Sequence, residues 1–173
     1  MALTGEYLGM PVYVDDLDQE NLGFYSYCGQ GELRLQQCTG CGLKRYPPTT
    51  ACPWCASPES TWEPVAGTGT LYSYGEVHHA IQPAFREFAP YLLLLVELDE
   101  QRDQPAPYDG LRITGNLATA TGDLAPPELV KQVGIGSRLK VVFKPIGAGI
   151  ALPLWCLDDA AEQPPNPWRY PDE

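Results

Sequence analysis

Four cysteines, arranged as two Cys-x-x-Cys pairs, constrain this chain more than any other feature of its sequence. They are Cys38, Cys41, Cys52 and Cys55. The pairs stand ten residues apart in CTGCGLKRYPPTTACPWC, where Gly40, Gly42 and Pro53 supply turn-forming residues. Each tight turn brings two sulfur atoms together, and two such turns complete a tetrahedral site of four thiolates, which suits zinc or iron. The sequence therefore predicts one structural Zn²⁺ per chain, bound by all four cysteines.

The same cysteines admit other interpretations. The patterns CxxCG and CPxC also resemble the knuckles of rubredoxin, which binds iron, so a rubredoxin-like electron carrier remains an alternative. A redox-active pair at a strand-to-helix junction would leave the second pair without a role. Disulfides are disfavoured because thiols stay reduced in the cytoplasm, where this chain is expected. A site closed by four sulfurs has no vacant position for substrate, which makes the metal a scaffold and not a catalyst.

The cytoplasmic expectation comes from the N-terminus and from hydropathy. The segment MALTGEYLGMPVYVDD has neither the cationic start nor the apolar run of a signal peptide. The apolar run Leu92–Val96 is far shorter than the roughly 20 residues that cross a bilayer, so no membrane partner is expected. The formal charge of −11 and a pI near 4.5 argue against a nucleic-acid binder, which would need a basic face.

The order of secondary-structure signals predicts a mostly β protein. Eighteen prolines and seventeen glycines favour short elements and many turns. A helix is expected from a cap at Asp15-Asp16 to about Tyr27, followed by a strand, GELRLQQ, that leads into the first Cys-x-x-Cys pair. Five further strands are expected in GTGTLYSYGEVH, PYLLLLVELDE, LRITGNLAT, RLKVVFKPI and IALPLWCLD, with Gly115 as a bulge in the third. Alternation along the first of these strands places Leu71, Ser73, Gly75 and Val77 on one face.

A short helix, ELVKQVG, stands between the third and fourth of these five strands. Five strands with that helix position are typical of the OB-fold, a Greek-key barrel. We therefore expect an N-terminal helix and zinc ribbon in residues 1–62, a five-stranded OB barrel in 63–158 and an extended C-terminal arm in 159–173. OB barrels often bind single-stranded nucleic acid, which is the second alternative function.

The segment Leu92–Val96 is apolar on both faces, and one face of a small antiparallel barrel is normally solvated. We expect a cover from the zinc ribbon, the N-terminal helix or another protein chain.

No complete catalytic set is visible. Histidines occur only at His78 and His79, and adjacent strand residues point to opposite faces. The sequence contains no serine elbow, HExxH or phosphate-binding glycine loop. Cys28 and Cys156, outside the four-cysteine set, are interpreted as small buried hydrophobic residues. These observations predict a non-catalytic chain.

Two groups of residues are candidates for ligand and partner contacts. Five cations are candidates for binding phosphate groups, and the alternative is that they form a solvated surface. They are Lys44, Arg45, Arg138, Lys140 and Lys144. Aromatic residues mixed with arginine are typical of protein interfaces. On this basis the expected partner contacts are His78, Phe85, Arg86, Phe88, Tyr91, Trp168, Arg169 and Tyr170.

Several segments together resemble a known family, the acyl-CoA-associated OB-fold proteins with an N-terminal rubredoxin-like zinc ribbon. The matching segments are the leading helix, CTGCGLKRYPPTTACPWCAS with Trp62 after it, GTGTLYSYGEVHH, PYLLLLVELDE and GIGSRLKVVF. The chain departs from the family pattern in its longer insert, EQRDQPAPYDGLR, and in its Trp-bearing C-terminal arm.

This resemblance implies a small subunit that pairs with a thiolase-superfamily protein. Such pairs include archaeal thiolase with hydroxymethylglutaryl-CoA synthase, steroid side-chain aldolases and the benzoylsuccinyl-CoA thiolase of anaerobic toluene degradation. In these complexes the thiolase-like chain carries out C–C cleavage or condensation of a CoA thioester. The small chain stabilises the complex, which is expected here to be a two-plus-two heterotetramer. The resemblance also implies contact with the CoA or acyl pocket, where the five cations listed above would bind the phosphates of CoA.

Overall fold

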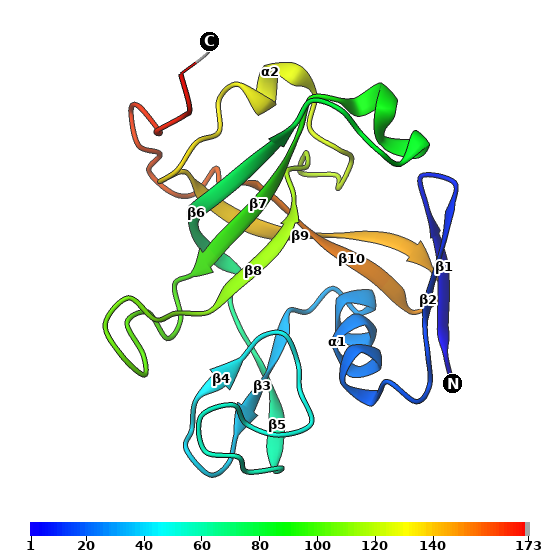
Figure 1. Ribbon diagram of the computed structural model, residues 1–173, viewed down its shortest axis with the longest axis vertical. Coiled ribbons are helices and arrows are strands. Elements are labelled where there is room, and N and C mark those ends of the chain that lie inside the picture. Colours follow the sequence, from blue (N-terminus) through cyan, green and yellow to red (C-terminus); the bar gives the residue numbers. More distant parts are fainter. Residues whose placement is uncertain (172–173) are drawn as a thin grey trace.

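The computed structural model describes residues 1–171. These residues form three sheets, two α-helices and one 3₁₀ helix. A five-stranded barrel forms the centre, the ribbon sheet lies at its lower end, and an N-terminal hairpin flanks it (Figure 1). Among the described residues, neither α-helix combines the length and the apolar character needed to span a bilayer.

The chain begins with a two-stranded hairpin that the sequence analysis did not predict. Strands β1 (Leu3–Tyr7) and β2 (Met10–Val14) pair in register from Leu3 opposite Val14 to Tyr7 opposite Met10. Leu8 and Gly9 at the turn both have positive φ, 51° and 74°, as a type I′ turn requires. The hairpin buries Tyr7 and Val14 against Ile146 and Ile150 at the end of the barrel.

The predicted N-terminal helix is confirmed as α1 (Gln19–Gly29), but its cap is Asp18 and not Asp15-Asp16. The Asp18 carboxylate accepts hydrogen bonds from the backbone N–H of Asn21 at 3.1 Å and from its side-chain amide at 2.8 Å. These bonds hold the pKa of Asp18 below its usual value. An aspartate two or three residues earlier cannot reach the free N–H groups of this helix start.

The ribbon is a three-stranded sheet in the order β4-β3-β5. Its strands are β3 (Arg34–Cys38), β4 (Lys44–Arg45) and β5 (Ser60–Pro64). Trp62 of β5 packs on α1. A Cβ added at Gly23 of this helix would lie 2.8 Å from the indole ring of Trp62, and the ring centres of Trp62 and Tyr27 are 5.6 Å apart. This contact joins ribbon and helix into one unit.

The barrel sheet has the order β10-β9-β6-β7-β8, all neighbours antiparallel. Its strands are β6 (Thr68–Val77), β7 (Tyr91–Leu98), β8 (Arg112–Asn116), β9 (Arg138–Gly147) and β10 (Ile150–Leu157). A parallel bridge between Leu117 and Trp155 closes β8 onto β10. A strand order of 5-4-1-2-3 with 3 closing on 5 is that of an OB barrel, which confirms the predicted fold. The short helix α2 (Pro127–Val130) has Pro127 at its first position.

A bulge at Tyr72 overturns the predicted side-chain alternation of β6. The sequence placed Leu71, Ser73 and Gly75 on one face, but the register with β7 shifts between Leu71 and Ser73. Leu71 therefore points inward opposite Val96, whereas Ser73 points outward opposite Leu95. A bulge inserts one residue and so exchanges the faces of all residues that follow.

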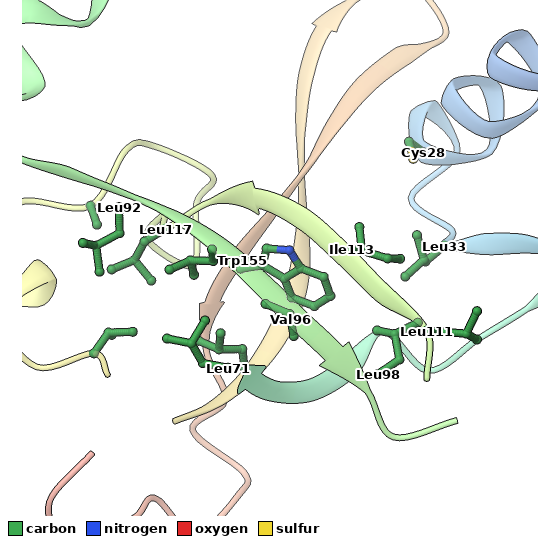
Figure 2. Packing of buried hydrophobic residues seen from close by; sticks show 14 of the residues in the cluster. Cys28, Leu33, Leu71, Leu92, Val96, Leu98, Leu111, Ile113, Leu117 and Trp155 are labelled. Atoms are coloured by element: carbon green, nitrogen blue, oxygen red, sulfur yellow. The ribbon is translucent and has the colours of Figure 1, made fainter. Parts of the chain in front are cut away.

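Gly115 does not form the predicted bulge, because its register with Leu94 is regular. Instead it makes room for Trp155, the largest fully buried side chain, since a Cβ at Gly115 would lie 2.9 Å from Cδ1 of the indole. Figure 2 shows Trp155 at the centre of the barrel core, between residues from β6, β7 and β8.

Candidate metal centre

The four predicted ligands converge at the tip of the ribbon. The Sγ atoms of all four cysteines lie within 4.8 Å of one another, with Cys38–Cys55 and Cys41–Cys52 each at 3.6 Å. A zinc ion bound tetrahedrally at about 2.3 Å from each sulfur implies sulfur separations of about 3.8 Å. The sulfurs therefore fit a tetrathiolate zinc site with little adjustment.

The backbone of each knuckle directs N–H groups at the sulfurs, as the turn residues predict. The amides of Cys41 and Gly40 donate to the Cys38 sulfur. Together with the neighbouring thiols of Cys55 and Cys52, these bonds, of which that from Cys41 is the strongest, lower the pKa of Cys38 to about 6. The Leu43 amide donates to Cys41, yet burial and the three neighbouring sulfurs raise the pKa of Cys41 to about 12. Because four thiolates repel one another, they can all ionise only around a cation. Gly42, with φ of 77°, forms the left-handed turn of the first knuckle.

Arg45 is buried in the ribbon, which removes it from the expected CoA phosphate contacts. Its side chain is directed inward, its Nε donates to Gln36 at 2.9 Å, and Nη2 donates to the Thr49 carbonyl at 2.8 Å. Gln36 also accepts from the Thr49 amide at 2.8 Å. This network fixes the segment between the two knuckles, which has only the two-residue strand β4 as regular structure. Arg45 thus supports the metal site from within the ribbon.

The insert that follows β7 connects the barrel to the ribbon. The Gln101 side-chain amide accepts from the Lys44 backbone N–H at 2.6 Å and donates to the Lys44 carbonyl at 2.8 Å, so it pairs with β4 as a further strand would. The sequence analysis missed this contact, because its partners are 57 residues apart and a glutamine in a loop carries no local signal.

Each predicted phosphate-binding cation of β9 is paired with a carboxylate. Arg138 binds Asp99 through both terminal nitrogens at 2.7 and 2.5 Å, and Lys144 binds Asp123 at 2.6 Å. Lys140 lies 3.9 Å from Asp158 and 3.8 Å from Asp159. A phosphate would have to compete with these carboxylates at all three positions.

Of the predicted interface residues in and beside the loop between β6 and β7, some are packed within this chain and others are exposed. It contains the 3₁₀ helix η1 (Pro83–Phe88). Phe85 packs against Tyr7 of the hairpin at 6.0 Å between ring centres and against Tyr91 at 5.2 Å. Phe88 is half-buried, whereas Arg86 and His78 are exposed, with His78 Nε2 3.6 Å from Glu76.

The C-terminal arm is extended and lies docked on the barrel. Trp168 forms a bridge with Ile135. Arg169 donates to the carbonyls of Val130 and Val133 at 2.7 and 2.5 Å and to Glu76 at 2.8 Å. The exposed fractions of Trp168 and Tyr170 are 50% and 70%, so these two rings stay available on the surface.

Arg169 is therefore expected to stabilise the free chain. Arg169→Met removes three charge-assisted hydrogen bonds and leaves Glu76 without its cation, which should lower the free energy of unfolding by about 1.5–3 kcal/mol. Chemical denaturation measures this loss, with Arg86→Met, at an exposed position, as the matched control. Equal stability of the two variants would contradict a clamping role for Arg169.

Cys28 and Cys156 are buried in the core, as predicted. Burial raises the pKa of the Cys28 thiol to about 12 and also raises that of Cys156. Both thiols are therefore kept in the unreactive protonated form.

Comparison with known proteins assigns both parts of the chain. Residues 26–61 match the rubredoxin-like zinc ribbon domain of ChsH2, and residues 62–144 match the C-terminal OB-fold domain of ChsH2. The two matches join without a gap and together take in well over half of the chain. This protein therefore belongs to the ChsH2-type family of zinc-ribbon and OB-fold proteins, also described as DUF35 proteins, as its sequence resemblance implied.

Relatives of this chain include longer proteins. It is 35% identical over 107 residues to a probable enoyl-CoA hydratase alpha subunit of Thermomonospora curvata, covering 62% of this chain and 30% of that protein. It is 32% identical over 111 residues to a DUF35 domain-containing scaffold protein of Methanocaldococcus jannaschii, covering 64% of this chain and 66% of that one. The match thus takes in less than a third of the hydratase subunit.

Two solved structures share the fold. A chain of the Ltp2–ChsH2 (DUF35) aldolase superposes with a TM-score of 0.64 at 28% identity, over 83% of this chain and 98% of that one. A DUF35 protein of unknown function from Sulfolobus solfataricus superposes with a TM-score of 0.50 at 13% identity, over 82% and 87% of the two chains. The second likeness concerns the fold alone.

Proposed function

We propose that this chain is a non-catalytic, zinc-binding accessory subunit of a thiolase-like enzyme that cleaves or forms C–C bonds in acyl-CoA thioesters. The observation that carries the proposal is the match to the Ltp2–ChsH2 aldolase, which extends over 98% of the matched chain and includes ribbon and barrel together. A two-plus-two assembly with the thiolase-like chain and a cytoplasmic location belong to the same proposal.

The chemistry of the six cysteines supports a non-catalytic role. Four of them form the metal cage, whose sulfurs are occupied as ligands once zinc is bound. The other two are buried thiols with raised pKa values. In this proposal the partner contributes the nucleophilic cysteine and the acid–base groups. The zinc holds the ribbon rigid, and Gln101 couples the ribbon to the barrel, which gives the partner a preformed surface.

The proposal extends to a contact between this chain and the phosphates of CoA. Because Arg138, Lys140 and Lys144 are paired with carboxylates and Arg45 is buried, Lys44 is the candidate that best suits a phosphate. Lys44 is half-buried beside the first knuckle, where zinc binding would fix its backbone.

Co-purification from the native host tests the proposed function directly. A tagged copy of the full chain is expected to retain a thiolase-superfamily protein in equal amount, identified by mass spectrometry and sized by analytical ultracentrifugation. Recovery of the chain by itself under conditions that preserve zinc would contradict the proposal.

The isolated chain is expected to turn over no acyl-CoA, and activity should arise only when the thiolase-like chain is added. Chromatography with mass spectrometry, which follows the loss of each thioester and the appearance of shorter or longer acyl-CoA products across a panel of acyl-CoA thioesters, measures this. Turnover by a preparation shown by mass spectrometry to lack the partner would make this chain an enzyme in its own right.

A further inference from the structure

One surface of the barrel presents outward leucines that no other part of the described chain covers. We call it the outer sheet face and define it by the outward residues of β6, β7 and β8. These residues are Ser73, Gly75, Leu93, Leu95, Thr114 and Asn116. The register places Leu93 between Gly75 and Asn116, and Leu95 between Ser73 and Thr114, and directly opposed residues project from the same side of a sheet. The alternate residues Leu92, Leu94 and Val96 are fully buried in the core.

The upper part of the outer sheet face is hollowed beside an exposed leucine. Leu93 is 48% exposed, and an open hollow of about 310 Å³ lies among Leu93, Leu95, Gly75 and Thr114. A Cβ added at Gly75 would meet no atom within 4 Å, so the floor of the hollow beside Leu93 is open. An exposed leucine beside a hollow can bind an apolar side chain of a partner protein.

A series of ion pairs borders this face at its lower end. Arg112 binds Glu97 at 2.8 Å and Arg138 binds Asp99 at 2.5 Å. Arg102 reaches the same two carboxylates only at 3.4 Å each, and its side chain is 45% exposed. Three guanidinium groups thus share two carboxylates, and Arg102 is the most loosely held of the three.

Arg102 also borders a second hollow of about 300 Å³, lined by Tyr72, Leu71 and Ile135 among others. Its loosely held guanidinium therefore has space for an additional carboxylate, which can bind bidentately. A partner that contacts Arg102 is therefore expected to present a negatively charged group there.

Nothing else in the described chain covers the outer sheet face. The ribbon and α1 lie at the lower end of the molecule, away from the start of β7, where Leu93 stands (Figure 1). Strands β7 and β8 are the second and third barrel strands, whose outer face OB folds commonly use for binding. Nucleic-acid binders place free aromatic rings there to stack on bases. This face instead presents leucines at its centre, and the ring of Tyr72 beside it is stacked by Arg112 at 3.9 Å.

We propose that the outer sheet face is the docking surface for the thiolase-like partner. The partner inserts an apolar side chain into the hollow beside Leu93 and places a carboxylate on Arg102. This inference rests on the proposed function and names the surface through which that function is exerted.

The test uses the thiolase-like chain identified by co-purification, expressed together with variants of the full chain. Leu93→Asp should weaken association at least about thirtyfold, as loss of a central apolar contact does. Gly75→Leu places a side chain in the hollow at a position where an added Cβ meets no atom within 4 Å, and it should weaken association at least about tenfold. Arg102→Gln should weaken it by about five- to tenfold and reduce its dependence on salt. The matched control is Leu17→Asp, at a leucine that is 88% exposed on the N-terminal segment, which should bind as the wild type does.

The outcomes separate this inference from the proposed function. If the wild-type complex forms and Leu93→Asp and Gly75→Leu bind equally well, the docking surface is wrong and the accessory role stands. If the wild type retains no thiolase-like chain, the accessory role and the docking surface both fail. A homodimer of the isolated chain that Leu93→Asp converts to monomers would assign the face to a second copy. Binding of single-stranded oligothymidine that Leu93→Asp abolishes would assign it to nucleic acid. Either result overturns the proposal.

Discussion

Replacement of Cys38 by serine is expected to abolish zinc binding and unfold the ribbon while the barrel stays folded. The tip of the ribbon has few buried side chains of its own, because its strand β4 has two residues and the buried side chains of Cys38 and Cys52 are both ligands. Structural zinc contributes roughly 10–16 kcal/mol to such segments at neutral pH. The loss of one of four thiolates should therefore release the metal and, with it, the fold of residues 34–64.

Two measurements follow this loss. Elemental analysis should find one zinc per wild-type chain and close to none in Cys38→Ser, and the wild type should be colourless, as an iron-containing rubredoxin would not be. Hydrogen exchange should lose protection in β3 and β5 but keep it in β6 to β10. Cys156→Ser, which changes a buried cysteine outside the cage, is the matched control and should retain its zinc. A ribbon that stays protected without metal would refute the structural role of the site.

The metal site was predictable because its information is local. Four ligands within eighteen residues, with glycine and proline at the turns, specify the cage before any tertiary contact forms. The order of strands and helices carried the OB topology in the same way, since each strand was marked by its own turns. The support around the site was not predictable, since the Arg45–Gln36 pair and the Gln101–Lys44 pair depend on how distant segments meet.

The sequence prediction was wrong or incomplete at places where a single residue determines the local backbone geometry. The bulge at Tyr72 reverses the faces of β6 and so creates the outer sheet face, although strict alternation in the sequence gives no sign of it. The hairpin before α1 was missed because Leu8-Gly9 is a weaker turn signal than Asn-Gly, although both residues adopt positive φ. Gly115 was assigned to a bulge, whereas its role is set by a tryptophan 40 positions later in the chain.

Replacement of that tryptophan, Trp155→Ala, should destabilise the barrel by about 3–5 kcal/mol. Its side chain is fully buried between β6, β7 and β8 (Figure 2), and neighbouring leucines can fill only part of the space it leaves. Total stabilities of small domains are about 5–15 kcal/mol, so this loss brings the barrel near its limit. Thermal and denaturant unfolding measure it. Trp155→Phe is the control and should lose much less, since it keeps most of the volume and removes an indole N–H that has no hydrogen-bond partner in the described chain.

The close approach of Gly115 to this ring makes the prediction specific. In the wild type, Gly115→Ala places a methyl group 2.9 Å from Cδ1 of Trp155 and should cost about 1–3 kcal/mol, as overpacking does. In the Trp155→Ala background the same methyl group enters vacated space, so Gly115→Ala should become neutral or stabilising. A double-mutant cycle measured by denaturation therefore should give a coupling free energy of about 1–3 kcal/mol. If the destabilisation caused by the two substitutions is simply additive, the strand geometry and not the tryptophan requires glycine at position 115. Only a direct steric contact predicts that Trp155→Ala relieves the cost of Gly115→Ala.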